Sequence, residues 1–581
     1  MRIINKILIA GLIGIVSFGC NESYLERPST DQLDASVYFS SATELEAYIN
    51  GLYDMLPNED VYQEDATSDN ILPLTVDARV MGTRIVPVDK GSGGWTWSDL
   101  RSINFFIDNY HVCPDEDAKK HYGGIAKYFR AWFYYTKVKR FGDVPWYGQV
   151  LEAGSDELYK PRDSRVLVMD SVLNDLNDAE AMIDAEVELN RITKYTALAL
   201  KARVCLFEGT FRKYHGLENY QKFLEEAASA AGELISSGAY SIYGTGGSAA
   251  AYGNLLNLLD QNSTETILAK QYHPDYTVHN TGYLMTSPTQ GAYGMTKDMI
   301  NSYLMADGNR YTDQAGYETT EFYEEMQNRD PRLTQTTAGP DFTAYGESSA
   351  ELVDLSGTTT GYRVVKSLSS KDNWDLKMSK NDIILFRYAE ALLVYAEAKA
   401  ELGIINQNDL DLSVNKLRDR VAMPHLQLGA ANANPDSFLE GMYPNVEQGP
   451  NKGVILEIRR ERRIELFMEG LRWDDLMRWK AGKKLEQAMV GIYFSGLGAH
   501  DFNNDGQTDV YLHDGDASGA PAGTPTIINV NTRKLTNGTS GYLNPFDYDV
   551  IFDETKDYLY PIPIEDIALN DNLLQNPNWE D

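Results

Sequence analysis

Oxygen-bearing side chains recur at alternate positions in one short segment of this 581-residue chain. Positions 1, 3, 5, 7 and 9 of the segment are Asp501, Asn503, Asp505, Gln507 and Asp509. A glycine at position 6 permits a sharp turn, and the backbone carbonyl at position 7 adds a ligand. Ca²⁺ prefers oxygen ligands, and calcium-binding loops supply them from alternate positions in this way. The spacing predicts a structural calcium loop, with a solvated Asn/Asp turn as the alternative; Leu512 at position 12 argues against an EF-hand sensor.

Motifs for other chemistry do not occur in the sequence. It contains no HExxH, no GxSxG and no Walker loop, and its eight histidines lack ligand spacing. Lys and Arg total 52 against 85 Asp and Glu, which gives a formal net charge of −33. A charge of this sign repels phosphate backbones, so nucleic acid is excluded as a partner.

The first twenty residues predict export and a lipid anchor. Arg2 and Lys6 precede an apolar run from Ile7 to Phe18, which is too short to span a bilayer. The run ends in Gly19-Cys20, which resembles the lipobox where bacterial lipoproteins are cut and acylated. We expect removal of residues 1–19 and lipidation of Cys20, with palmitate among the acyl chains; the alternative is a plain secretory signal peptide.

Apolar periodicity predicts helices at both ends of the chain and loops in the middle. Stripes at helical spacing occupy 42–56, 97–110, 125–136, 164–185, 195–209, 382–402 and 454–470. The segment 240–380 is rich in Gly, Ser, Thr, Asn and Tyr and reads as long loops with short strands such as 265–271. The expected fold class is mainly α, with paired helices and a loop-rich half.

The expected organisation is one domain from 20 to 581. Its helical scaffold covers about 36–235 and 380–485, and its loop-rich insertions cover about 60–98, 240–380 and 485–550. Within the scaffold, Glu457, Glu461, Glu465 and Glu469 recur every fourth residue beside four arginines between 459 and 463. Such stripes are typical of a solvated or internally paired face.

Seven motifs, in order, resemble the SusD/RagB family of Bacteroidetes outer-membrane lipoproteins. They are the helix start at 97–104, Phe129-Arg130-Ala131-Trp132-Phe133 through Phe141-Gly142-Asp143-Val144-Pro145, Pro161-Arg162 with Leu173-Asn174-Asp175-Leu176, the run 197–203, the run 386–398, the pair 461–466 and 470–476, and the tail Tyr560-Pro561-Ile562-Pro563 with Gln575-Asn576-Pro577. The resemblance covers nearly the whole chain after the signal peptide.

The resemblance implies both a fold and a role. Family members are built on tetratricopeptide-like helix pairs with a variable loop-rich half. They sit outside the outer membrane as lids over a SusC-like TonB-dependent transporter and capture glycans or, in some branches, peptides. The matching motifs are scaffold and identify no ligand-binding residue.

Ligand-binding residues are therefore sought among exposed aromatic and polar groups, because sugars offer flat C–H faces and hydroxyls. Trp95 follows a glycine-rich loop and is the candidate stacking platform. Trp97 lies on the apolar stripe of the next helix, which favours core packing, although it remains a candidate. Further candidates are Asp69, Arg84, Tyr293 and Trp374; the alternative for Asp69 is a helix cap or turn.

The sequence thus predicts a non-catalytic surface lipoprotein that captures glycan and delivers it to a SusC-like transporter. A peptide-capturing RagB-like binder is the alternative within the family. A helical glycoside hydrolase is the alternative from another class, and it needs an acid and a base across a cleft.

Overall fold

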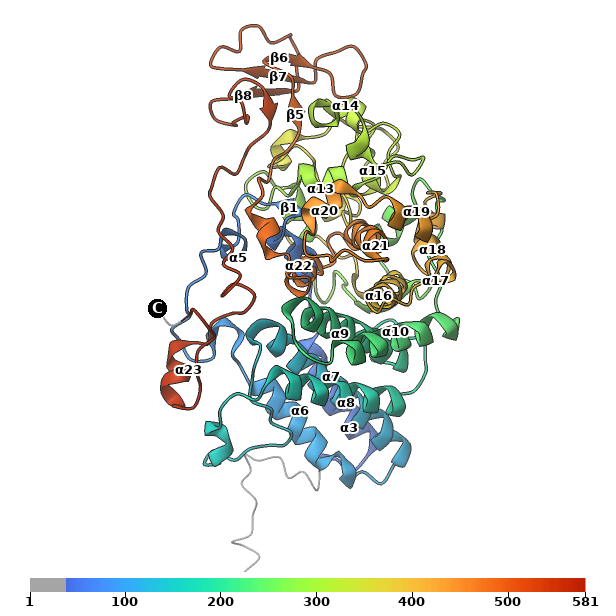
Figure 1. Cartoon of the computed structure of the whole chain (residues 1–581), viewed down its shortest axis with the longest axis vertical. Coiled ribbons are helices and arrows are strands. Elements are labelled where there is room, and N and C mark those ends of the chain that lie inside the picture. Colours follow the sequence, from blue (N-terminus) through green and yellow to red (C-terminus); the bar gives the residue numbers. More distant parts are fainter. Residues whose placement is uncertain (1–37, 580–581) are drawn as a thin grey trace, which may run out of the picture.

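The computed structural model describes residues 38–579, so the predicted signal peptide and Cys20 lie outside the described residues. The first half of the chain is helical (Figure 1). Its helices are α3 (Ala42–Leu52), α4 (Asp60–Gln63), α5 (Ala78–Met81), α6 (Ser98–Asn109), α7 (Glu116–Phe141), α8 (Arg165–Met182), α9 (Lys194–His215) and α10 (Tyr220–Ser237).

Local capping groups set the ends of the long helices. The Asp115 side chain accepts a hydrogen bond from the Ala118 N–H at the start of α7, and Gly142 ends that helix at φ 72°. Thr193 and Thr196 form a capping box at the start of α9, and Gly216 ends it in the left-handed region. Such caps satisfy backbone groups that have no partner inside the helix.

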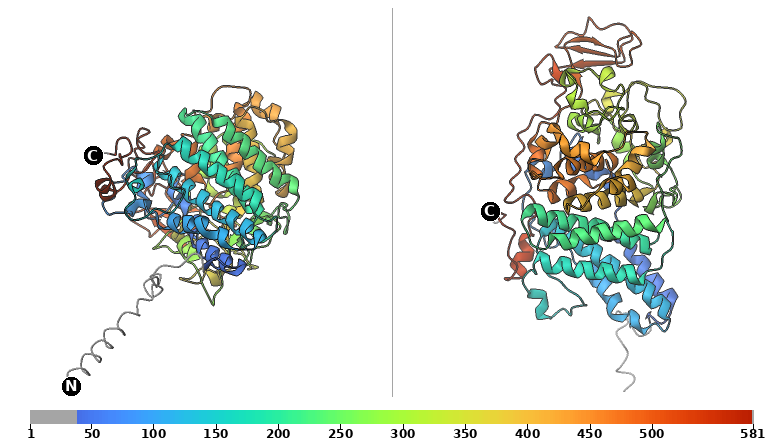
Figure 2. Two further views of the ribbon diagram at one scale, coloured as in Figure 1. Left: turned by 90° about the horizontal axis from the view of Figure 1, so that it is seen from below. Right: turned by 45° about the vertical axis from the view of Figure 1, so that its right-hand side comes forward.

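Consecutive helices stack into layers. Helix α7 packs against α8, α8 against α9, and α9 against α10, which in turn packs against α16 (Tyr388–Glu401) of the second half. Figures 1 and 2 show these helices lying side by side. A continuous hydrophobic core runs from Phe39 to Leu573. The prediction of a mainly α fold with helix pairs is confirmed.

The second half mixes short helices, short strands and loops. Its helices are α11 (Ala251–Asn257), α12 (Thr281–Thr286), α13 (Lys297–Ser302), α14 (Phe322–Glu325), α15 (Arg332–Thr336), α16, α17 (Gln407–Leu412), α18 (Val414–Arg420), α19 (Leu428–Ala433), α20 (Ser437–Met442), α21 (Lys452–Glu465), α22 (Arg472–Arg478) and α23 (Ile564–Leu569). Within the described residues, no helix combines the length and apolar composition needed to cross a membrane.

The strands within residues 38–579 form four small sheets. β1 (Ile71–Leu72) pairs with β3 (Gly294–Met295), β2 (Thr266–Lys270) with β4 (Ile383–Arg387), and β5 (Tyr493–Phe494) with β9 (Gly541–Tyr542). β6 (Gly498–His500), β7 (Val510–His513) and β8 (Thr526–Asn529) form a three-stranded sheet at one end of the molecule (Figure 1).

One predicted helix is partly a strand. The apolar run Ile383-Ile384-Leu385-Phe386 was expected to begin the helix 382–402, but it pairs antiparallel with β2. All five residues of β4 are buried. A short run that is buried on every side fits a strand as well as a helix, and here the available partner β2 decides. Helix α16 begins only at Tyr388.

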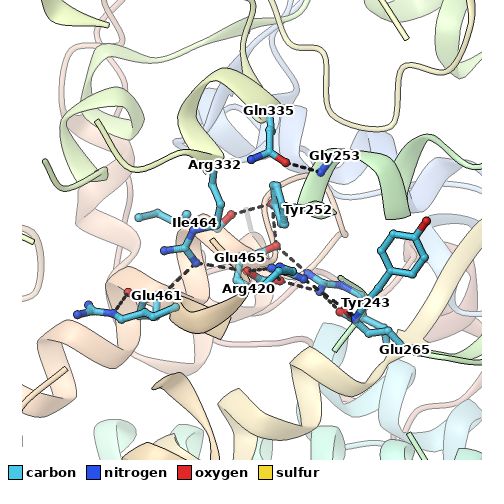
Figure 3. Close-up of polar contacts among 12 residues, drawn as sticks. Tyr243, Tyr252, Gly253, Glu265, Arg332, Gln335, Arg420, Glu461, Ile464 and Glu465 are labelled. Carbon is cyan, nitrogen blue, oxygen red and sulfur yellow. Dashed lines mark hydrogen bonds and ion pairs between the residues drawn. The ribbon is translucent and has the colours of Figure 1, made fainter. Parts of the chain in front are cut away.

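The charged side chains of α21 are buried, and most of them pair with residues of other elements. The Glu465 carboxylate forms ion pairs with Arg420 at 2.6 Å, Arg387 at 2.7 Å and Arg332 at 3.3 Å. Arg332 also pairs with Glu461 at 3.0 Å (Figure 3). Burial opposes ionisation of Glu465, but the three guanidinium groups outweigh it and hold its pKa well below the usual range. This confirms the internally paired reading of the stripe.

A second buried cluster joins the N-terminal region to α21 and α22. The Asp69 carboxylate forms ion pairs with Arg463 at 2.9 Å and Arg472 at 2.7 Å. Only 3% of the residue's surface is exposed. Burial opposes ionisation of Asp69, but Arg463 and Arg472 outweigh it and keep its pKa well below the ordinary value. Asp69 therefore holds segments together that are far apart in sequence.

Replacing Asp69 with Asn should lower the free energy of unfolding by about 3 kcal/mol, because two buried guanidinium groups lose their counter-charge. The urea midpoint measures this. The matched control is Asp547→Asn, whose ion pair with Lys534 is exposed and whose effect should stay within about 0.5 kcal/mol.

Acid should close the gap between wild type and Asp69→Asn. A carboxyl whose folded pKa is depressed stabilises the fold above its unfolded pKa and loses that contribution as the pH falls below it. Equal urea midpoints at pH 7 would contradict a structural role for Asp69.

Candidate ligand-binding site

The loop that carries Trp95 and Trp97 is held by its own glycines and by α7. Gly91, Gly93 and Gly94 all adopt positive φ, which suits residues without a side chain. From α7, the Lys137 Nζ donates a hydrogen bond to the Gly94 carbonyl at 2.5 Å. Burial lowers the pKa of Lys137 to about 8. The loop is thereby fixed against the helical scaffold.

Trp95 and Trp97 contact each other but differ in exposure. Trp95 is 4% exposed and packs edge-on against Phe141 with ring centroids 4.8 Å apart. Trp97 is half-buried, and its ring centroid lies 5.3 Å from that of Trp95. The expectation that Trp95 is the exposed platform and Trp97 the core residue is therefore corrected.

The physical reason lies in where α6 begins. Trp97 precedes the first helical residue and has a non-helical backbone, with φ −128° and ψ 3°. The helical spacing from Trp97 to Leu100 consequently does not place Trp97 on the buried stripe. Trp95 fills the space at the end of α7 instead.

A cavity of about 490 Å³ opens beside these two tryptophans. We call it the α6 cavity; it lies between the start of α6, the loop 145–159 and the region around α23. Its aromatic lining is Trp95, Trp97, Tyr147 and Tyr159, its apolar lining includes Leu100, Leu151, Leu158, Leu569 and Leu573, and its polar lining includes Lys90, Arg101, Asn104, Gln149, Asp566 and Asn570.

Polar side chains fix the walls of the α6 cavity. Asn104 Nδ2 donates to the carbonyls of Tyr147 at 2.9 Å and Gln149 at 3.1 Å, which shapes the loop that carries Tyr147. Asp566 accepts a hydrogen bond from the Gly91 N–H at 2.7 Å, linking α23 to the tryptophan loop. Burial raises the pKa of Asp566 above its ordinary value. The cavity thus combines aromatic faces with fixed polar groups, which suits an amphipathic ligand.

The other predicted ligand residues do not line the α6 cavity. Asp69 is enclosed by its two arginines, so the expectation of an accessible acceptor is corrected. Arg84 is buried against the C-terminal tail, where it pairs with Asp557 at 2.9 Å and lies over the Tyr560 ring at 4.4 Å. Tyr293 is 6% exposed. Trp374 donates its indole N–H to the Ser369 carbonyl at 2.7 Å. Asp69, Arg84 and Trp374 thus have partners within the protein, and a ligand role for Arg84, Tyr293 or Trp374 stays a prediction from the sequence.

Tyr147, Tyr159 and the α23 residues were missed by the sequence analysis. Tyr147 and Tyr159 occur in a proline- and glycine-containing segment after α7, a context typical of exposed aromatic residues. Residues 566–573 carry no such signal, because only the tertiary fold brings them beside α6.

The predicted calcium loop lies between β6 and β7. Asp501 accepts hydrogen bonds from the backbone N–H groups of Asn504 at 2.6 Å and Gly506 at 2.8 Å. Asp505 accepts from Gln507, and Asp509 from Phe502, each at 2.8 Å. Among the described residues, no group of three or more His, Cys, Asp or Glu side chains is placed to hold a metal. The carboxylates as arranged serve the turn, and calcium stays a prediction from the sequence pattern.

Adding Ca²⁺ to chelator-treated protein should raise its melting temperature if Asp501, Asn503, Asp505, Gln507 and Asp509 bind the ion, because a ligand that binds only the folded state stabilises it. Differential scanning calorimetry measures the shift. Asp505→Asn should reduce it, whereas Asp516→Asn in the following loop should not. An unchanged melting temperature would leave the turn as the function of this segment.

Paired helices, a loop-rich half and a cavity lined by aromatic rings define a mainly helical fold with room for a ligand. The sequence model described as the SusD family matches residues 260–579. That match covers more than half of the chain, and the chain belongs to the SusD family.

Individual relatives agree with this assignment. SusD-like protein P2 of Formosa agariphila is 25% identical and aligns over 80% of this chain and 89% of its own length. SusD-like protein P38 of the same organism is 26% identical over 66% and 71%. A SusD-like carbohydrate binding protein from Bacteroides fragilis has a TM-score of 0.67 at 20% identity, covering 92% of this chain and all of its own. A laminarin binding SusD-like protein has a TM-score of 0.55 at 18% identity, covering 93% and 100%.

Proposed function

We propose that this protein is a non-catalytic cell-surface lipoprotein that captures an oligo- or polysaccharide and delivers it to a SusC-like TonB-dependent transporter. The observation that carries the proposal is the α6 cavity, where tryptophan and tyrosine rings lie beside amide and charged groups. Names of relatives support the ligand class, since one similar structure is a carbohydrate binding protein and another binds laminarin.

Among the described residues, the α6 cavity has a single carboxylate, which supports binding without bond cleavage. Glycoside hydrolysis needs two carboxyl groups about 5–10 Å apart. Among the residues that line the α6 cavity, Asp566 is the single carboxylate. It accepts a hydrogen bond from the Gly91 N–H and so helps to hold the tryptophan loop in place. Capture by affinity alone is the simpler chemistry for this arrangement.

Anchoring through Cys20 would supply the advantage of capture. An acyl chain contributes about 0.8 kcal/mol per buried methylene, so several chains on one cysteine hold a protein at the outer membrane durably. Ligand bound by a tethered protein is presented to a neighbouring transporter at high effective concentration.

Peptide is the alternative cargo, favoured by one observation. Leu151, Leu158 and Leu569 give the α6 cavity apolar walls that suit apolar side chains as well as sugar faces. Parallel screening with neutral oligosaccharides and with peptides separates the two cargoes.

Replacing Tyr159 with Ala should weaken glycan binding by roughly fivefold through loss of one stacking face. The Tyr159 side chain is exposed, at 52% for the residue, so the melting temperature should change little. Calorimetric titration measures the affinity. The matched control is Tyr276→Ala, which removes a ring that is 88% exposed outside the cavity. Equal affinities for the wild type and Tyr159→Ala would remove Tyr159 from the site.

Tagged wild-type protein extracted from outer membranes with mild detergent should co-isolate a TonB-dependent transporter. Cys20→Ser should lose radiolabelled palmitate and leave the membrane fraction, because the anchor is gone. Mass spectrometry of the eluate identifies the partner. Membranes that yield the protein without any such transporter would contradict the delivery step.

A further inference from the structure

A second cavity of about 380 Å³ lies in the loop-rich half. We call it the α15 cavity; it is lined by parts of α11, α15 and the segment 339–345 and opens to solvent. It shares no lining residue with the α6 cavity. Helix α15 lies in the upper part of Figure 1, whereas α6 and α23 lie in the lower part.

The lining of the α15 cavity is polar but almost uncharged. Phe342 and Tyr345 contribute two half-buried rings, and Asn254, Asn257 and Gln327 contribute side-chain amides. Among its lining residues there is no Lys, Arg or His, and Asp341 is the one carboxylate. Flat rings beside amides match the C–H faces and hydroxyls of a sugar.

The amides keep unused hydrogen-bonding capacity. Asn257 Oδ1 is buried and has no hydrogen-bond partner among the described residues. Asn254 Nδ2 donates to the Thr245 carbonyl at 3.2 Å, and Gln327 Nε2 donates to the Tyr323 carbonyl at 3.1 Å. These two bonds hold the amide groups in place, and each amide oxygen is left to accept from a ligand. Asn257 Oδ1 itself is closed off from solvent, so the Asn254 and Gln327 oxygens are the acceptors that a ligand hydroxyl would meet.

The walls of the α15 cavity are held rigidly. Gln335 of α15 accepts the Gly253 N–H of α11 at 2.9 Å and donates to the Pro331 carbonyl at 2.9 Å. Figure 3 shows this link beside the buried pairs of Arg332, which belongs to the same helix. Phe342 is fixed by backbone bonds to Gly339 at 3.1 Å and Glu351 at 2.9 Å. A site that is already formed loses less conformational entropy when it binds.

We propose that the α15 cavity is a second saccharide-binding site, which takes a neutral sugar unit. This inference deepens the proposed glycan capture and rests on it for the ligand class. Within residues 38–579, the lining of the α15 cavity contains no Lys, Arg or His, and the chain carries a net charge of −33. Both disfavour uronate or sulfate groups, because no fixed positive charge offsets the cost of removing those anions from water. The amides disfavour a purely apolar ligand, which would leave them unpaired.

Methyl NMR tests the site directly, because Met326 lies in the α15 cavity and Leu158 and Leu569 line the α6 cavity. Full-length mature protein labelled at Met and Leu methyl groups is titrated with laminarihexaose, maltohexaose, cellohexaose and mannohexaose, and separately with hexagalacturonate. The Met326 methyl signal should shift in a saturable way with at least one neutral hexasaccharide and not with hexagalacturonate.

Variants tie the shift to the cavity. Tyr345→Ala should weaken the Met326 response by roughly fivefold, whereas Tyr548→Ala, which removes a ring that is 67% exposed elsewhere, should leave it unchanged. Unchanged melting temperatures show that both variants fold. A Met326 response that survives Tyr345→Ala undiminished, or that hexagalacturonate produces equally, would overturn the proposal.

The two cavities can fail separately. Shifts at Leu158 and Leu569 without a shift at Met326 would refute the second site and leave the proposed function standing. A shift at Met326 alone would support the second site and refute the α6 cavity as the capture site. No shift at either cavity with any neutral hexasaccharide would overturn both.

Discussion

The fold depends on charges that are buried together rather than exposed. Glu465 at the end of α21 is shared by Arg332, Arg387 and Arg420, which come from α15, β4 and α18. Taking such groups out of water is expensive, and their attraction repays the cost only when every partner is in place. An alternative packing of these elements would leave unpaired charge inside the protein. The cluster therefore selects one arrangement of the loop-rich half against its competitors.

The same constraint places the candidate sites. Asp69 with Arg463 and Arg472 joins the segment before β1 to α21 and α22, so the N-terminal chain is fastened to the second half before it runs back toward the tryptophan loop. Arg332 holds α15, which carries Gln335 into the wall of the α15 cavity. Both cavities are lined by helices together with loops, and helix α15 in the wall of the second is tied to the buried cluster through Arg332. Recognition surfaces that must stay open to solvent gain rigidity in this way without a hydrophobic core of their own.

The sequence predicted what local patterns determine and missed what distant partners determine. Helical periodicity and capping residues located most of the long helices, although none of the predicted stripes covers α10 (Tyr220–Ser237), and ordered motifs located the family. Periodicity failed at Ile383–Arg387, where burial on both sides hides the difference between strand and helix and the partner β2 decides. It also failed at Trp97, since the stripe was extended one residue beyond the true start of α6. The burial of Asp69 could not be predicted, because its two arginines lie about 400 positions away in the sequence. The contribution of α23 to the α6 cavity could not be predicted either, because α23 also lies far from α6 in the sequence.

The cavity chemistry is compatible with the proposed capture of neutral sugars by a protein of this charge. A net charge of −33 keeps polyanions away from the whole surface, yet neutral hydroxyls carry no charge to repel. Stacking and amide hydrogen bonds are short-ranged and insensitive to salt, so they select among neutral ligands on contact. The net negative charge acts at longer range and selects against anionic ligands. Two rigid cavities in different halves of the molecule also favour a polymer over its monomers. If both cavities bind sugar as proposed, a polysaccharide seated in one would meet the other at a raised effective concentration, and weak contacts at each would add to a stronger whole.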